Sequence, residues 1–90
     1  MTVTVFHFWS PTCNPCKVIK PAIDDIQEEF AGRIEWISIN TKDDPKGAAP
    51  RLGVTIVPTI VVVKDGIEVG RHSGTQIAIY YTLIRKALAA

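Results

Sequence analysis

The order of strand-like and helix-like segments is the feature that most restricts the fold of this chain. Residues 2–8 (TVTVFHF) are β-branched and aromatic, which predicts a buried strand. Apolar side chains then recur at helical spacing from the cysteine at position 13 to about Gly32, and residues 34–40 (IEWISIN) again favour a strand. Two strands joined through a helix run parallel with a right-handed crossover. The first forty residues or so therefore predict a βαβ unit.

The second half of the chain predicts two further strands between two helices. Asp44 offers an N-cap before a proline, which predicts the start of a short helix that Gly53 would end. Residues 59–63 and 67–72 are strand-like, and the tight turn between them indicates a hairpin. The last segment repeats apolar side chains at helical spacing, at Ile77, Tyr81, Ile84 and Leu88. The predicted order is β-α-β-α-β-β-α, an α/β fold with a four-stranded mixed sheet between helices on both faces.

Length and charge set limits on the function. Ninety residues fit one domain, residues 1–90, and we expect a monomer. Ten basic and nine acidic residues leave a net charge of +1 without a basic arm, so nucleic acid is not an expected ligand. No stretch is long and apolar enough for a membrane span, and the N-terminus lacks the features of a signal peptide. We therefore expect a cytoplasmic protein, in which two cysteines rarely form a structural disulfide.

The stretch FWSPTCNPCK, residues 8–17, contains the only two cysteines, Cys13 and Cys16. They lie where the first predicted strand turns into the first helix, and the N–H groups and dipole of a helix N-terminus favour a thiolate. We expect an exposed Cys13 with a lowered pKa to attack a substrate disulfide, and a shielded Cys16 to resolve the mixed disulfide. Pro15 removes one N–H donor and Asn14 brings no charge, so a moderate lowering of the pKa is expected.

Two other interpretations of the cysteine pair remain open at this point. The pair could be buried core residues without chemistry, or half of a metal site. A metal site usually needs four ligands, and the chain offers no second cysteine pair, so His7 and His72 would have to converge on the first one. Under the redox interpretation no metal or cofactor is needed, because the two sulfurs carry the electrons.

The stretch FWSPTCNPCK, together with Pro21 and Val57-Pro58-Thr59, resembles the thioredoxin family. The resemblance implies a thioredoxin-like three-layer sandwich, with Cys13 as nucleophile and Cys16 as resolving thiol. It implies that Trp9 packs beside the site and that Pro58 is cis, so that the Val57 backbone can pair with an extended substrate. The substrate-binding residues that it implies are Trp9, Thr12, Asn14, Pro15, Val57 and Pro58.

The chain also departs from the family pattern. It begins at the strand that the family would call its second, which would leave residues 34–40 at a sheet edge. Thr12 replaces a tryptophan, Asn14 replaces a glycine, and Ser38 replaces a lysine. His7 stands where the family carries a buried aspartate that accepts the proton of the second cysteine. We hypothesise that the His7 imidazole accepts the Cys16 proton instead; the alternative is a packed histidine with satisfied hydrogen bonds.

The function that follows is a thiol–disulfide oxidoreductase that reduces protein disulfides through the Cys13–Cys16 dithiol. By resemblance, an NADPH-dependent thioredoxin reductase would recharge it. Three alternatives stay open: a glutathione-linked, glutaredoxin-like oxidoreductase, a non-catalytic interaction module with a thioredoxin fold, and a metal-binding protein that uses both cysteines.

Overall fold

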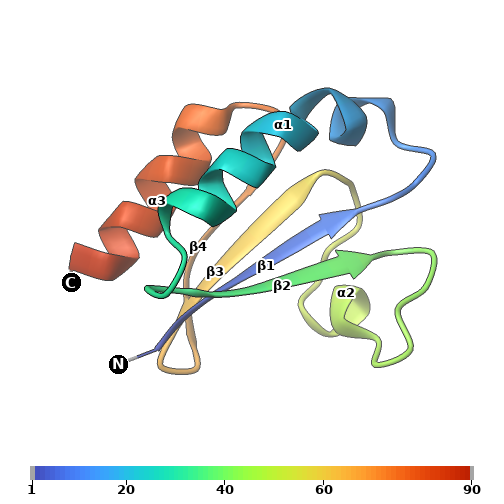
Figure 1. Ribbon diagram of the computed structural model, residues 1–90. Coiled ribbons are helices and arrows are strands. Elements are labelled where there is room, and N and C mark those ends of the chain that lie inside the picture. The colour runs from blue at the N-terminus through green and yellow to red at the C-terminus, as the bar shows by residue number, and fades with distance from the viewer. Residues whose placement is uncertain (1, 90) are drawn as a thin grey trace.

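The computed structural model describes residues 2–89, and the order of its elements is the predicted β-α-β-α-β-β-α (Figure 1). Each predicted strand and helix is present, with bounds that differ by a few residues. The elements are β1 (Val3–Trp9), α1 (Asn14–Glu29), β2 (Glu35–Asn40), α2 (Ala48–Arg51), β3 (Thr59–Lys64), β4 (Ile67–Ser73) and α3 (Ile77–Ala89).

The four strands form one mixed sheet in the order β2-β1-β3-β4. β1 and β2 are parallel, as the βαβ prediction requires, and β3 is antiparallel to both β1 and β4. β1 therefore lies inside the sheet, with hydrogen-bonded neighbours on both sides. β2 and β4 are the two edge strands, and the predicted hairpin of β3 and β4 is confirmed.

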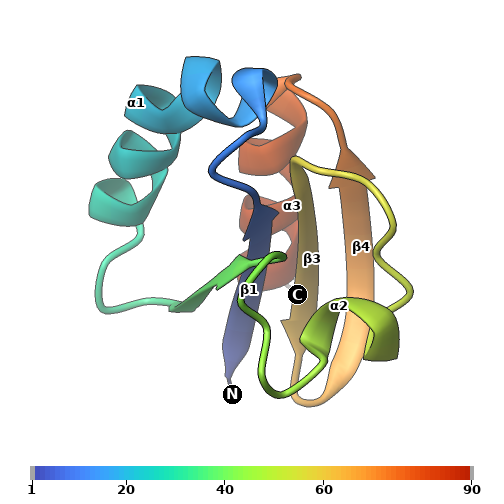
Figure 2. The ribbon, with the colours of Figure 1, turned by 90° about the vertical axis from the view of Figure 1, so that its right-hand side faces the viewer.

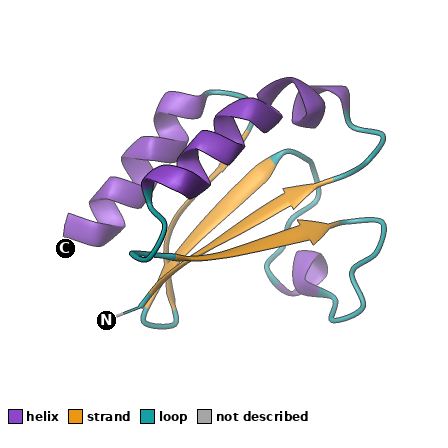
Figure 3. Ribbon diagram, in the orientation of Figure 1, coloured by secondary structure: helices purple, strands orange, loops and turns teal. Residues whose placement is uncertain are grey.

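Helices cover both faces of this sheet, α1 and α3 on one and α2 on the other (Figures 1 and 3). The larger core lies under α1 and α3 and includes Val5, Ile26 and Tyr80, all fully buried. The smaller core lies under α2 and is built around Phe8 and Val61. Because side chains alternate along a strand, neighbouring residues of β1 supply opposite cores. The expected three-layer α/β sandwich is confirmed.

The short helix α2 begins later than predicted. The sequence placed its start at Asp44-Pro45, but the helix comprises only Ala48–Arg51, and Gly47, with φ of +62°, is its N-cap. The Asp44 carboxylate still acts on this helix, because it accepts hydrogen bonds of 2.9 Å from the N–H groups of Ala48 and Ala49. These backbone bonds also lower the pKa of Asp44. The predicted capping residue thus reaches the helix from four residues ahead.

The first helix, α1, continues through Pro21 to Glu29, and Phe30 caps it two residues before the predicted terminator Gly32. No helix among residues 2–89 is long and apolar enough to cross a membrane. The described chain starts and finishes at the same end of the molecule, and the loop from β1 into α1 lies at the other end (Figures 1 and 2).

Candidate active site

Cys13 and Cys16 form a disulfide at the N-terminus of α1, with their Cα atoms 5.3 Å apart. Cys13 is the N-cap residue, and its sulfur accepts a hydrogen bond of 3.2 Å from the Cys16 N–H. No acidic side chain stands in the first turn of the helix. The environment of the Cys13 sulfur thus favours a thiolate when the pair is reduced. Cys13 is half-buried and Cys16 only 7% exposed, so the two sulfurs differ in access.

The loop that leads into Cys13 is organised by Ser10, a buried residue that the sequence interpretation left without a role. The Ser10 carbonyl accepts from the Cys13 N–H at 3.1 Å, and its hydroxyl accepts from the Thr12 N–H at 3.3 Å. The hydroxyl also lies 3.1 Å from the Thr12 hydroxyl. A serine followed by proline and threonine is a recognisable turn signal, because a hydroxyl can bond to the backbone two residues later.

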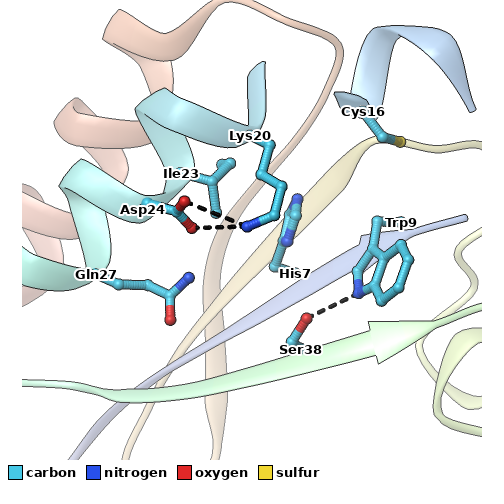
Figure 4. Close-up of a pocket in the computed structure, with 8 residues that line it drawn as sticks. All are labelled: His7, Trp9, Cys16, Lys20, Ile23, Asp24, Gln27 and Ser38. Atoms are coloured by element: carbon cyan, nitrogen blue, oxygen red, sulfur yellow. Dashed lines mark hydrogen bonds and ion pairs between the residues drawn. The ribbon is translucent and has the colours of Figure 1, made fainter. Parts of the chain in front are cut away.

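Three of the predicted substrate-contacting residues surround the disulfide on the surface. Thr12, Asn14 and Pro15 are all exposed. Trp9, at the end of β1, is half-buried, and its indole N–H donates a hydrogen bond of 2.8 Å to the Ser38 hydroxyl of β2 (Figure 4). The serine that departs from the family pattern therefore fixes the orientation of the tryptophan ring.

The remaining two predicted substrate-contacting residues, Val57 and Pro58, directly precede β3, and the peptide bond between them is cis. Thr59 pairs with Phe8 across the sheet, so Pro58 lies at the same end of the sheet as Trp9 and the disulfide loop. Pro58 is buried and Val57 is half-buried. All of the predicted site residues therefore gather at one end of the molecule.

His7 lies in β1 behind the disulfide and lines a cavity of about 170 Å³ together with Cys16 (Figure 4). Its side chain is only 6% exposed, and its Nε2 atom has no hydrogen-bond partner among the described residues. Burial lowers the pKa of His7 to about 4, so the imidazole is neutral near neutral pH. The His7 ring also packs against Trp36 of β2, with the ring centroids 5.7 Å apart, so the packed-histidine alternative stays open beside the proton-acceptor hypothesis.

The other wall of this cavity comes from α1, and sequence reasoning missed it. Lys20, Asp24 and Gln27 line the cavity at helical spacing from Cys16, and the Lys20 ammonium lies 3.1 Å from the Asp24 carboxylate (Figure 4). The spacing was a usable signal, since residues three and four apart share one helix face. Within residues 2–89 no cluster of three or more His, Cys, Asp or Glu side chains could hold a metal ion.

Comparisons with known proteins show the family of this chain. The thioredoxin family model matches residues 1–85. A thioredoxin of Haemophilus influenzae is 37% identical over 78 residues, a match that covers 82% of this chain and 72% of that protein. The chloroplastic thioredoxin M4 of Arabidopsis thaliana is 41% identical over 60 residues, which cover 67% of this chain and only 31% of that protein.

A solved structure gives the same result. The X-ray structure of Fasciola hepatica thioredoxin has a TM-score of 0.82 and 30% sequence identity, and the likeness covers 93% of this chain and 80% of that one. The four-stranded mixed sheet and the three helices thus form a thioredoxin-like α/β fold that matches a solved thioredoxin structure. The chain belongs to the thioredoxin family, and its Cys13–Cys16 disulfide is consistent with a thiol–disulfide oxidoreductase.

Proposed function

We propose that this chain reduces disulfide bonds in other proteins. The observation that carries the proposal is the Cys13–Cys16 disulfide at a helix N-terminus, with Cys13 the more accessible residue. In the reduced protein the Cys13 thiolate attacks a substrate disulfide, forms a mixed disulfide and releases one substrate thiolate. Cys16, as a thiolate, then attacks the Cys13 sulfur and releases the second. Two electrons pass to the substrate, and the internal disulfide is restored.

We propose that His7 accepts the proton that Cys16 loses in the second step. The support is that both residues line one cavity and that the buried imidazole is neutral, so it can accept a proton. The low pKa makes this imidazole a weak base, so the proton would be held briefly and passed on to solvent. The cavity, lined also by the exposed residues Lys20 and Asp24, gives water a path to the site.

The test of this role is the rate of mixed-disulfide resolution in His7→Ala, with His72→Ala as the matched control. The rate is followed over pH 5–9, roughly the range around the pKa values of free histidine and cysteine. We expect a slower resolution with an altered pH profile for His7→Ala alone. An unchanged profile in His7→Ala would rule out the proton-acceptor role.

We propose that substrates are held by the residues around the disulfide, namely Trp9, Thr12, Asn14, Pro15, Val57 and Pro58. The support is their position at one end of the sheet and the exposure of three of them beside Cys13. An extended substrate segment would pair with the Val57 backbone, as in other strand-addition complexes. Such pairing recognises the main chain, so it suits a range of protein substrates.

For the physiological setting we propose an NADPH-dependent thioredoxin reductase as electron donor and the cytoplasm as compartment. A dithiol reductant needs surroundings that keep thiols reduced, and the cytoplasm provides them. Relatives with chloroplast names also match, and the match spans only 31% to 38% of three of those proteins. We propose that the protein acts as a monomer without a prosthetic group, because both cysteines belong to one chain.

The first experiment is the reduction potential of the Cys13–Cys16 pair, measured by equilibration with glutathione buffers and thiol alkylation. A value near −270 mV, about that of a strong dithiol reductant, supports protein-disulfide reduction. A value above about −200 mV would instead indicate a glutaredoxin-like function or a function as an oxidant. Failure to form the internal disulfide at any ratio would refute the redox function.

A further inference from the structure

The segment between α2 and β3, residues 52–58, carries the proposed substrate-binding pair Val57-Pro58 and forms neither helix nor strand. A segment of this kind has no regular ladder of backbone hydrogen bonds to fix its path. Its first residues are tied to α2, because the N–H groups of Leu52, Gly53 and Val54 donate to carbonyls of that helix. The position of Val57 therefore depends on what holds the end of α2 and on contacts farther along the segment.

Three carbonyl groups of this segment are held by hydrogen bonds from the following strands. The Leu52 carbonyl accepts from Arg71 Nη2 at 2.7 Å, and the Pro58 carbonyl accepts from the Gly74 N–H at 3.0 Å. The Ile56 carbonyl accepts from the Thr59 hydroxyl at 2.7 Å. The Thr59 hydroxyl lies 2.7 Å from the hydroxyl of Ser73, the last residue of β4. Arg71 of β4 and Gly74 after β4 thus support the segment at its start and end, and Thr59 of β3 supports Ile56 between them.

The Arg71 contact differs from the others because the side chain is itself fixed. Its Nε and Nη2 atoms donate to the two carboxylate oxygens of Glu68, at 2.7 and 2.6 Å. This fork-to-fork geometry orients the guanidinium plane and leaves Nη2 able to reach Leu52 as well. Arg71 pairs with Val61 in the sheet, and the Val61 side chain belongs to the core beneath α2. Arg71 therefore joins the edge strand to the C-terminal end of α2.

We infer that Arg71 is a positioning residue for substrate binding, which holds Leu52 and thereby sets the position of Val57-Pro58. The inference rests on the proposed function, because it takes the Val57 backbone as the contact for an extended substrate. The side-chain hydrogen bonds of Arg71 go to Glu68 and Leu52 and not to the cysteines. Its effect should therefore appear in the KM for a protein substrate rather than in the chemical step.

Two disulfide substrates separate this role from a general effect on the fold. Insulin presents its disulfides on a chain that can pair with Val57, whereas the small aromatic disulfide dithiobis(nitrobenzoate) needs only access to Cys13. For Arg71→Ala we expect the KM for insulin to rise about threefold, the scale of one partly exposed charged hydrogen bond. We expect kcat to stay within about twofold and the rate with the aromatic disulfide to be unchanged.

Arg85→Ala is the matched control. Arg85 also forms an ion pair with one glutamate, Glu29, at 3.1 Å, but it lies on α3, away from residues 52–58. Arg71→Lys should recover part of the KM, since an ammonium can still donate one bond to Leu52. If Arg71→Ala does not fold, Arg71→Met replaces it, because methionine keeps an unbranched apolar stem and removes the donors to Glu68 and Leu52. Arg71→Met should raise the same KM.

The outcomes discriminate between the inference and the function on which it rests. Equal KM values for Arg71→Ala and Arg85→Ala would overturn the inference, and so would an equal slowing with both substrates. If the wild-type protein reacts with the aromatic disulfide but does not reduce insulin, the proposed function fails before the variants are compared. A rise in KM confined to insulin and to variants of the β4 contacts supports the inference.

Discussion

Acidification should destabilise this protein through His7, because the native state buries a neutral imidazole. The pKa of His7 falls from 6.5 to about 4 on folding, and the cause is desolvation. The unfolded chain therefore binds a proton at a pH where the native state does not, and the free energy of unfolding falls as pH decreases from about 6.5 towards 4. With about 1.4 kcal/mol for each pKa unit, the loss is roughly 3 kcal/mol. That is a large part of the stability of a small domain.

The assay is urea unfolding of the oxidised protein at several pH values from about 7.5 to 4, for the wild type, His7→Gln and His72→Gln. Carboxylates titrate in all three proteins, so the quantity of interest is the difference between wild type and variant at each pH. The charged groups that line the His7 cavity, Lys20 and Asp24, remain in every variant. Their effects on other groups therefore largely cancel.

The expected result is that His7→Gln loses much less stability on acidification than the wild type, while His72→Gln behaves as the wild type does. The glutamine cannot take up a proton, so the histidine contribution disappears with it. If His7→Gln and the wild type show the same dependence on pH, the imidazole is not kept neutral by burial, and the reasoning is refuted. The proton-acceptor proposal would then also lose its basis.

Three further predictions concern the site and its support. Cys16→Ser should accumulate a stable mixed disulfide between Cys13 and a substrate, seen by mass spectrometry, because the resolving thiol is gone; rapid release of substrate would contradict it. Gly74→Ala should lower the free energy of unfolding by about 1–3 kcal/mol, because φ at Gly74 is +141°, a backbone conformation that residues with a Cβ rarely adopt. Equal urea midpoints would contradict this. Tyr80→Phe should lower the free energy of unfolding by about 1 kcal/mol in the same assay, because the buried Tyr80 hydroxyl donates to the Gly74 carbonyl at 2.8 Å. An unchanged urea midpoint would show that this hydrogen bond makes no net contribution to stability.

Much of the fold was predictable because local patterns and topology agree. The alternation in β1 assigns Val5 to one core and Phe8 to the other, and the helical period of α1 buries Ile19, Ile23 and Ile26. The cysteine pair was also predictable, since its spacing and its place before a helix are both local. These signals can be read without knowing the tertiary contacts of the elements.

The parts that could not be predicted depend on the exact path of a turn or on contacts between distant segments. Asp44 bonds to Ala48 and Ala49 across the intervening Gly47, so the position of α2 follows from that turn rather than from capping rules. The Arg71–Leu52 bond joins residues 19 apart and requires β4 beside α2. The cavity behind His7 forms only when α1 packs over β1 and β2, and a cavity between packed elements cannot be predicted from a sequence pattern.

The arrangement of the chain ends has a practical consequence for attaching this protein to a solid support. The first and last described residues lie away from the disulfide loop, at the opposite end of the sandwich (Figures 1 and 2). A tether at either end would therefore present the reactive sulfur outward, away from the support. Immobilised on a bead or an electrode through a terminal tag, the protein should keep its disulfide loop open to large partners, whereas a lysine-directed coupling through Lys17 would crowd it.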